Sequence, residues 1–220
     1  MITLYHCSSA RSFRPLWTLE EMGLPFELKM LPFPPRALAK EYLGVNPLGT
    51  IPFLIDGDTR MSESAAICQY LVERYGPSPL AVSRDDPAYG AWLNFLHFGE
   101  ATLTVPQTIV LRYTHLEPPE RRLPQAVDDY RIVFHGRLKK LEPLLAREEF
   151  LCAGRFTAAD IVVGYALLLA ERLALDDDFT PAVRAYWTRL QQREAFQRAM
   201  ATQARAGQAQ GVTPTPHRRS

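Results

Sequence analysis

One stretch of the chain, residues 45–57, constrains the fold more than any other. It contains a turn marked by Pro47 and Gly49, then Pro52 directly before a short apolar run, then an Asp-Gly pair. Proline has no N–H group, so it is tolerated only at the first residue of a strand, at a bulge or on a sheet edge. Asp-Gly is a strong signal for a tight hairpin. The stretch therefore predicts a turn, a strand that opens at the proline, and a β-hairpin.

A helix is predicted directly after the hairpin, from Glu63 to about Tyr75. The N–H groups in the first turn of a helix lack intrahelical partners, and the positive end of the helix dipole favours an anion there. If the Ile51-Pro52 peptide bond is cis, the Ile51 main chain turns outward and can pair with an extended peptide. The sequence leaves the isomer open, since most X-Pro bonds are trans.

The first 77 residues read as strand, helix, strand, followed by a hairpin and a helix. Alternating and helical apolar spacing, with glycines and prolines at the boundaries, defines the segments. We expect strands at 2–5, 26–30, 53–55 and 59–61, and helices at 11–23, 37–43 and 63–75. A strand–helix–strand unit implies a parallel pair with a right-handed crossover. This order predicts a thioredoxin-like domain over residues 1–77.

The remainder of the chain is predicted to be all-helical, over residues 86–203. Long helices are expected at 86–113, with an interruption at Pro106, and at 123–147, with Pro143 near its end. Residues 161–170 are apolar on nearly every side, which predicts a buried central helix. Residues 204–220 contain few large apolar side chains, and we expect them to form a disordered tail.

Thr157 and Asp160 stand at the positions of a capping box at the start of the central helix. Thr157 is an N-cap type, and Asp160 follows three residues later, where Glu is the usual residue. Phe156 and Ile161 fall at the positions of a hydrophobic staple. We therefore interpret Asp160 as a residue for folding and not as a catalytic acid.

Composition excludes several classes of function. Of the 220 residues, 47% are hydrophobic, and the formal net charge is +1, so the composition lacks the basic excess typical of nucleic-acid-binding proteins. No apolar run approaches the length of a membrane span, and we expect no signal peptide. Cys7, Cys68 and Cys152 lie too far apart in the sequence for a metal-ligand or disulfide pattern, so no metal site is predicted. A reducing, cytoplasmic location is the simplest expectation.

The motifs at residues 46–52 and 63–67 resemble those of the glutathione S-transferase superfamily. They read N-P-L-G-T-I-P and E-S-A-A-I, and the resemblance extends over about residues 1–203. It implies a thioredoxin-like N-terminal domain followed by an all-helical C-terminal domain. It also implies glutathione as a substrate, with no bound cofactor. The glutathione-binding residues that it implies are Thr50, Ile51, Pro52, Glu63 and Ser64.

The loop after the first strand is where the glutathione thiol would be activated. An ordinary thiol is only a few per cent ionised at neutral pH, so a hydroxyl donor at the sulfur would favour the reactive thiolate. Similar proteins place a serine where this chain has Ala10. We predict Ser9 or Ser12 as the catalytic residue. Tyr5, Cys7 and main-chain amides alone are the alternatives, and either serine could instead simply cap the first helix.

The resemblance also implies a second-substrate pocket between the domains. Phe13, Arg112 and Tyr113 are its candidate lining residues, in a setting of aromatic and apolar walls that suits a hydrophobic electrophile. A homodimer is also implied, with the helices around 65–75 and 92–100 at the interface.

Four functions are compatible with these residues. The leading one is conjugation of the glutathione thiolate to a small hydrophobic electrophile. Isomerisation of maleylacetoacetate or a related acid is a second, although Ala10 follows Ser8-Ser9 where that subfamily has cysteine. Glutathione-dependent disulfide reduction is a third. A non-catalytic glutathione-binding interaction module is the fourth, and Ala10 favours it.

Overall fold

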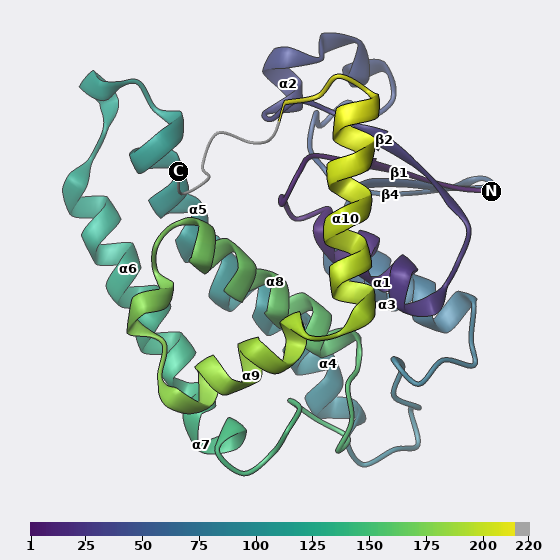
Figure 1. The fold of residues 1–220 in the computed structure, drawn as a ribbon, viewed down its shortest axis with the longest axis vertical. Coiled ribbons are helices and arrows are strands. Elements are labelled where there is room, and N and C mark those ends of the chain that lie inside the picture. The colour runs from purple at the N-terminus through teal and green to yellow at the C-terminus, as the bar shows by residue number, and fades with distance from the viewer. Residues whose placement is uncertain (214–220) are drawn as a thin grey trace. The chain divides into compact units, whose positions relative to one another are not determined.

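The computed structural model describes residues 1–213, and they form two compact units (Figure 1). The first unit contains residues 1–81 together with the described residues from 191 onward, and the second contains residues 82–190. The C-terminal helix therefore belongs to the first unit, although the sequence predicted it to be part of the second domain. Among the described residues, no helix combines the length and the apolar character needed to cross a membrane.

A four-stranded mixed sheet forms the centre of the first unit. Its strands, in the spatial order β2-β1-β3-β4, are β1 (Ile2–His6), β2 (Phe26–Met30), β3 (Phe53–Asp56) and β4 (Thr59–Met61). β1 pairs in parallel with β2 and antiparallel with β3, with Leu4 opposite Leu28 on one side and Leu54 on the other. This topology confirms the predicted thioredoxin-like arrangement.

The helices of the first unit are α1 (Phe13–Met22), α2 (Pro35–Leu38), a 3-10 helix (Lys40–Gly44), α3 (Ser64–Arg74) and α10 (Glu194–Ala209). α1 packs against both α3 and α10. Its apolar residues Leu16, Trp17 and Leu19 are fully buried. It ends where Gly23 adopts a left-handed conformation (φ 61°) and donates its N–H to the Leu19 carbonyl, as the sequence indicated.

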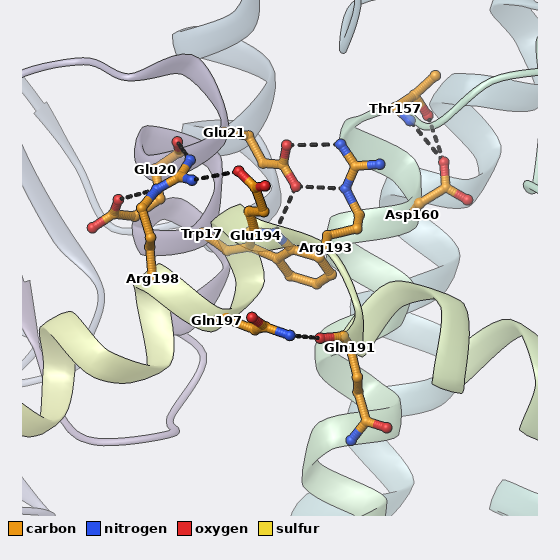
Figure 2. Close-up of polar contacts among 10 residues, drawn as sticks. All are labelled: Trp17, Glu20, Glu21, Thr157, Asp160, Gln191, Arg193, Glu194, Gln197 and Arg198. Atoms are coloured by element: carbon orange, nitrogen blue, oxygen red, sulfur yellow. Dashed lines mark hydrogen bonds and ion pairs between the residues drawn. The ribbon is translucent and has the colours of Figure 1, made fainter.

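Helix α10 is joined to α1 by charged and aromatic contacts (Figure 2). Arg193 forms a bidentate ion pair with Glu21, with N–O distances of 2.7 and 2.8 Å, and the Trp17 indole N–H donates to the same carboxylate. Arg198 pairs with Glu20. The Phe196 ring meets Trp17 edge-on, with centroids 5.0 Å apart. These contacts explain why the helix is part of the first unit.

The predicted disordered tail is wrong for residues 204–209, which form the last turns of α10. The sequence contains few large apolar side chains there, and the end of the helix is joined to β2 by the amide of Gln210, the residue that follows α10. The Gln210 side chain accepts a hydrogen bond from Met30 N–H (2.8 Å) and donates one to the Leu28 carbonyl (2.9 Å). β2 is an edge strand, so these are main-chain groups that would otherwise be unpaired. Residues 214–220 of the predicted tail lie outside the described residues.

The second unit is all-helical among its described residues. Its elements are α4 (Tyr89–His97), a π-helical segment (Phe98–Thr104), α5 (Val105–Leu111), a second π-helical segment (Arg112–Leu116), a 3-10 helix (Pro119–Arg121), α6 (Pro124–Leu138), a 3-10 helix (Lys139–Leu141), α7 (Glu142–Leu145), α8 (Ala158–Arg172), a 3-10 helix (Asp176–Asp178) and α9 (Pro181–Gln191). α8 is buried almost throughout, as predicted. The predicted interruption near Pro106 takes the form of the π-helical segment that ends just before α5.

The π-helical segment at residues 98–104 packs so closely against α8 that only glycine fits at position 99. A Cβ atom on Gly99 would lie 2.8 Å from the Val162 main chain. The pairing therefore depends on the absence of a side chain in the π-helical segment.

The capping box at the start of α8 is confirmed (Figure 2). The Asp160 carboxylate accepts from Thr157 N–H at 2.8 Å and from the Thr157 hydroxyl at 3.2 Å. Its other oxygen accepts from Leu151 N–H at 3.0 Å and from the Tyr186 hydroxyl at 2.9 Å. Asp160 is fully buried, and burial raises its pKa to about 6. All four contacts are structural, which supports the predicted role in folding.

Candidate functional site

The turn before β3 is held by two side chains that contact one carbonyl. The Tyr42 hydroxyl (2.8 Å) and the Asn46 amide (2.9 Å) both donate to the Thr50 oxygen. The Ile51-Pro52 peptide bond, which the sequence left open, is cis. Within residues 1–213, the Ile51 main chain forms no hydrogen bond to the protein. Its N–H and C=O groups are therefore compatible with the predicted pairing to an extended peptide.

The start of α3 combines a helix N-terminus with a buried positive charge. Ser64 is the first residue of the helix, and Glu63, at the N-cap, is exposed. The Arg14 side chain is fully buried and donates from Nη1 to the Ser64 hydroxyl at 2.9 Å. A hydroxyl that accepts this bond can still donate its own proton to an anion. The guanidinium and the helix dipole both favour negative charge at this position.

Arg14 matches a loop arginine of the family that is more often a structural charge than a ligand, so its contact with Ser64 was not predicted from the sequence. It lies in α1 and contacts α3, 50 residues further along the chain. A signal was present, since Arg14 interrupts the apolar run that continues through Leu19. Charged residues are almost never fully buried unless paired, so an arginine on a buried helix face indicates a specific partner.

Ser12, one of the two predicted catalytic residues, forms hydrogen bonds with the main chain of the loop in which it lies. It lies at the N-cap of α1, but its side chain does not cap the helix. Its hydroxyl instead accepts from Cys7 N–H at 3.3 Å and donates to the Cys7 carbonyl at 3.4 Å. The side chain is fully buried. This arrangement supports a structural role for Ser12.

Ser9, the other predicted catalytic residue, has a left-handed backbone conformation, with φ 54°. That region is sparsely populated by residues other than glycine, and the surrounding structure must stabilise it. Gln203 from α10 provides contacts of this kind: its Oε1 accepts from Ser9 N–H at 2.9 Å, and its Nε2 donates to Ser9 Oγ at 3.3 Å. Ser9 is only 1% exposed.

Tyr5 and Cys7, the alternatives to the serines, lie in an apolar cluster with Tyr42 and Phe53. The Tyr5 ring lies 5.3 Å from that of Tyr42, centroid to centroid. Burial raises the pKa of the Cys7 thiol to about 12, so this cysteine is protonated at neutral pH and is a poor nucleophile. Ala10, the departure from the family pattern, is buried in the same cluster.

His6 is fully buried beside the loop, and its Nε2 lies 3.0 Å from Gln203 Oε1. Burial lowers its pKa to about 4, so the ring is neutral at pH 7. Because the unfolded chain binds the proton more readily, this neutral ring supports folding fully above about pH 6.5. That contribution is lost as the pH falls toward about 4.

We expect the wild-type protein to lose about 3 kcal/mol of unfolding free energy between about pH 6.5 and 4 through His6 alone. A His6→Gln variant has no such titration. The difference in unfolding free energy between the wild-type protein and this variant should therefore narrow as the pH falls. Urea unfolding across this range measures both. Parallel pH curves for the two proteins would contradict the buried, neutral histidine.

All three residues predicted to line the second-substrate pocket contact other side chains of the protein. Phe13 is fully buried, and its ring meets Phe196 edge-on with centroids 5.6 Å apart. In the second unit, exposed Arg112 forms an ion pair with Glu117 and lies over the Tyr113 ring. The predicted pocket between the domains remains a prediction.

A cavity of about 610 Å³ occurs elsewhere, within the second unit. It follows one face of α6, and its lining includes Arg131, His135, Lys139 and Asp178. None of the predicted site residues lines it, so this cavity does not bear on the predicted glutathione site.

Comparison with known proteins gives consistent matches. The profile of the family described as "Glutathione S-transferase, N-terminal domain" matches residues 8–74. Glutathione S-transferase 3 of Schizosaccharomyces pombe is 30% identical over 194 residues, covering 78% of this chain and 75% of that protein.

Solved structures agree with these matches. The glutathione transferase URE2P6 from Phanerochaete chrysosporium, in complex with oxidized glutathione, is 29% identical with a TM-score of 0.81, and the match covers 93% of this chain and 97% of that one. Ure2p5 from the same organism, cocrystallized with 1-(S-glutathionyl)-2,4-dinitrobenzene, is 26% identical with a TM-score of 0.81, covering 93% and 95%.

The mixed sheet, the helical second unit and the turn before β3 thus define a two-part fold of thioredoxin-like and helical units. The chain belongs to the glutathione S-transferase superfamily, and its enzyme class is that of the glutathione S-transferases.

Proposed function

We infer that this enzyme joins the sulfur of glutathione to a small hydrophobic electrophile. The observation that carries the proposal is the Arg14–Ser64 contact at the start of α3. Glutathione carries a carboxylate at its γ-glutamyl end, and the buried guanidinium and the helix N-terminus both favour an anion there. Glu63 and Ser64 are assigned to that end, and the Ile51 main chain to the cysteinyl part, with Thr50 and Pro52 beside it.

The reaction needs one deprotonation and one displacement. The glutathione thiol loses its proton to solvent water and the thiolate attacks an electron-poor carbon. A carbon–sulfur bond forms as the leaving group departs with its electron pair. Ure2p5, a similar protein, was cocrystallized with 1-(S-glutathionyl)-2,4-dinitrobenzene, a conjugate of the kind that this chemistry would form. Stabilising the thiolate is the step that the loop between β1 and α1 would serve.

Ser9 is the proposed donor to the thiolate. Gln203 donates to the Ser9 hydroxyl, and a hydroxyl that accepts a hydrogen bond becomes a stronger donor through its own proton. Ser12 is the second candidate, and the main-chain amides at the start of α1 are the third. No cofactor takes part in this proposal, since glutathione is itself the substrate.

We expect Ser9→Ala to raise the pKa of bound glutathione and to lower turnover at neutral pH. Affinity should change little, because the bond matters mainly once the sulfur is ionised. The loss should shrink as the pH rises and the thiol ionises unaided. Steady-state conjugation rates across pH measure this. If only Ser12→Ala gives that pH-dependent loss, the role belongs to Ser12; if neither does, the main-chain amides suffice.

Retention on glutathione resin followed by a conjugation assay tests the proposal. The electrophile is a 1-halo-2,4-dinitrobenzene. Formation of the glutathione conjugate is the first readout, and release of the halide ion is the second. Retention without turnover on any electrophile would indicate a binding module. Turnover only with a glutathione mixed disulfide would indicate a reductase. Turnover only with a maleyl acid would indicate an isomerase.

We also propose a cytoplasmic homodimer. All three cysteines are free thiols, which is the usual state in a reducing compartment. Sedimentation equilibrium gives the assembly state directly, and a monomeric mass would exclude the dimer.

A further inference from the structure

We propose that Gln203 is a positioning residue for the thiol site and that it fixes the loop between β1 and α1 from the C-terminal helix. The inference rests on the proposed glutathione chemistry of that loop. Gln203 is 4% exposed and lies 194 residues from Ser9, so a motif confined to the N-terminal half cannot include it.

The hydrogen bonds fix the orientation of the Gln203 amide. A main-chain N–H can only donate, so the side-chain atom that faces Ser9 N–H must be the oxygen. The nitrogen then faces the Ser9 hydroxyl at 3.3 Å and Met200 Sδ at 3.2 Å. The same oxygen lies 3.0 Å from the His6 Nε2, so that nitrogen carries the proton. One amide thus contacts the end of β1 and the strained residue of the loop.

This amide stabilises an otherwise unfavourable backbone. A left-handed backbone is unfavourable for serine and persists only where the surrounding structure determines it. Gln203 contacts Ser9 through both its main chain and its side chain. Without the amide, the Ser9 N–H would lose a buried acceptor and the loop would relax toward a commoner conformation. The groups that would stabilise the thiolate would then lie in different positions.

α10 is held firmly enough to serve as the support. Arg193 and Arg198 pair with Glu21 and Glu20 on α1, before the position of Gln203 along the helix (Figure 2). Beyond Gln203 in the sequence, the Gln210 side chain forms hydrogen bonds with two main-chain groups of the edge strand β2, Met30 N–H and the Leu28 carbonyl. The amide is therefore attached to the rigid part of the first unit from both directions.

Gln203→Met tests the inference, because methionine keeps the volume and removes every amide hydrogen bond. We expect kcat/KM at neutral pH to fall about tenfold or more, with the KM for glutathione within about threefold of wild type. The loss should shrink at higher pH, as for Ser9→Ala. Gln208→Met, on the exposed side of the same helix, is the matched control and should behave as wild type.

The other groups near the amide do not titrate in the relevant range. Burial lowers the pKa of His6 to about 4 and raises that of Cys7 to about 12, so neither changes charge between about pH 6 and 9. On α1, the Glu20 and Glu21 carboxylates are paired with Arg198 and Arg193. Arg14, also on α1, is a guanidinium and keeps its charge throughout this range. A pH-dependent loss in that window therefore reports on the glutathione thiol.

Combining the two substitutions separates positioning from general destabilisation. If Gln203 acts through the loop, Gln203→Met should add little to Ser9→Ala in the double variant. A folded Gln203→Met protein with the wild-type pH profile would overturn the inference, as would a fully additive, pH-independent loss. Absence of conjugation by the wild-type protein would instead overturn the proposed function.

Amide exchange of the wild-type protein decides the matter if Gln203→Met does not fold. The main-chain amide of Ser9 should then exchange as slowly as the buried amides in the middle of α10. The reason is that the loop can expose this amide only when its hydrogen bond to Gln203 breaks. Exchange of the Ser9 amide at the rate of an exposed loop would overturn the inference.

Discussion

Asp160→Ala should lower the unfolding free energy by about 3–5 kcal/mol and the melting temperature by on the order of 10 °C. The substitution leaves the main-chain N–H groups of Thr157 and Leu151 and the Tyr186 hydroxyl without a buried acceptor. Because a typical domain is stable by only 5–15 kcal/mol, soluble yield should also fall. The protein that still folds should keep its turnover per active site. Thermal unfolding and active-site titration measure the two effects.

The pH dependence gives this prediction a second readout. Burial raises the pKa of Asp160 to about 6, so the stability linked to its proton is fully present below about pH 4 and is lost as the pH rises through about 6. The unfolding free energy of the wild-type protein should therefore exceed that of the alanine variant by more at about pH 5 than at pH 8. Asp129→Ala, at an exposed position on α6, is the control and should cost less than about 0.5 kcal/mol. Normal melting with abolished activity would make Asp160 catalytic after all.

Ser64→Ala should weaken glutathione binding by about ten- to a hundredfold. The substitution removes a hydroxyl that would donate to the γ-glutamyl carboxylate, a charge-assisted bond of about 1.5–3 kcal/mol. It also removes the acceptor that holds the Arg14 guanidinium at 2.9 Å, so the buried charge would lose one of its contacts. Isothermal calorimetry with glutathione measures the affinity. A melting curve checks that the fold survives.

Ser62→Ala is the matched control for this variant. Ser62 lies two residues earlier, before the helix, and has no assigned contact to the ligand, so its loss should leave the affinity unchanged. Equal losses in both variants would indicate an indirect effect on the segment. Unchanged affinity in Ser64→Ala would show that glutathione does not bind at the start of α3.

Much of the fold could be predicted because its signals are local. The proline before β3, the Asp-Gly turn and the alternating strand at residues 26–30 each act over a few residues, and the sheet confirms them. Thr157 and Asp160 form their capping box within one helical turn. Short-range sterics and hydrogen bonding determine such features, and neighbouring residues suffice to specify them.

The candidate site could be predicted only in part, because some of its contacts join distant segments. Residues 63–64 were identified from their motif, but the Arg14 guanidinium behind them lies on another helix. Ser9 was identified as a hydroxyl near the thiol, whereas its burial, its left-handed backbone and its contact with Gln203 are features of the folded chain. The tail after residue 203 was mispredicted because a hydrophobicity criterion does not detect binding by amides.

The sequence by itself determined the two-part architecture, the turn that precedes β3, the anion-favouring start of α3 and the superfamily to which these belong. Tertiary structure alone decided the contacts of the two candidate serines and the assignment of the C-terminal helix to the first unit. The physical reason is that a buried polar group is stable only beside its partner. Where that partner is 50 or 194 residues away, only the folded chain brings the two together.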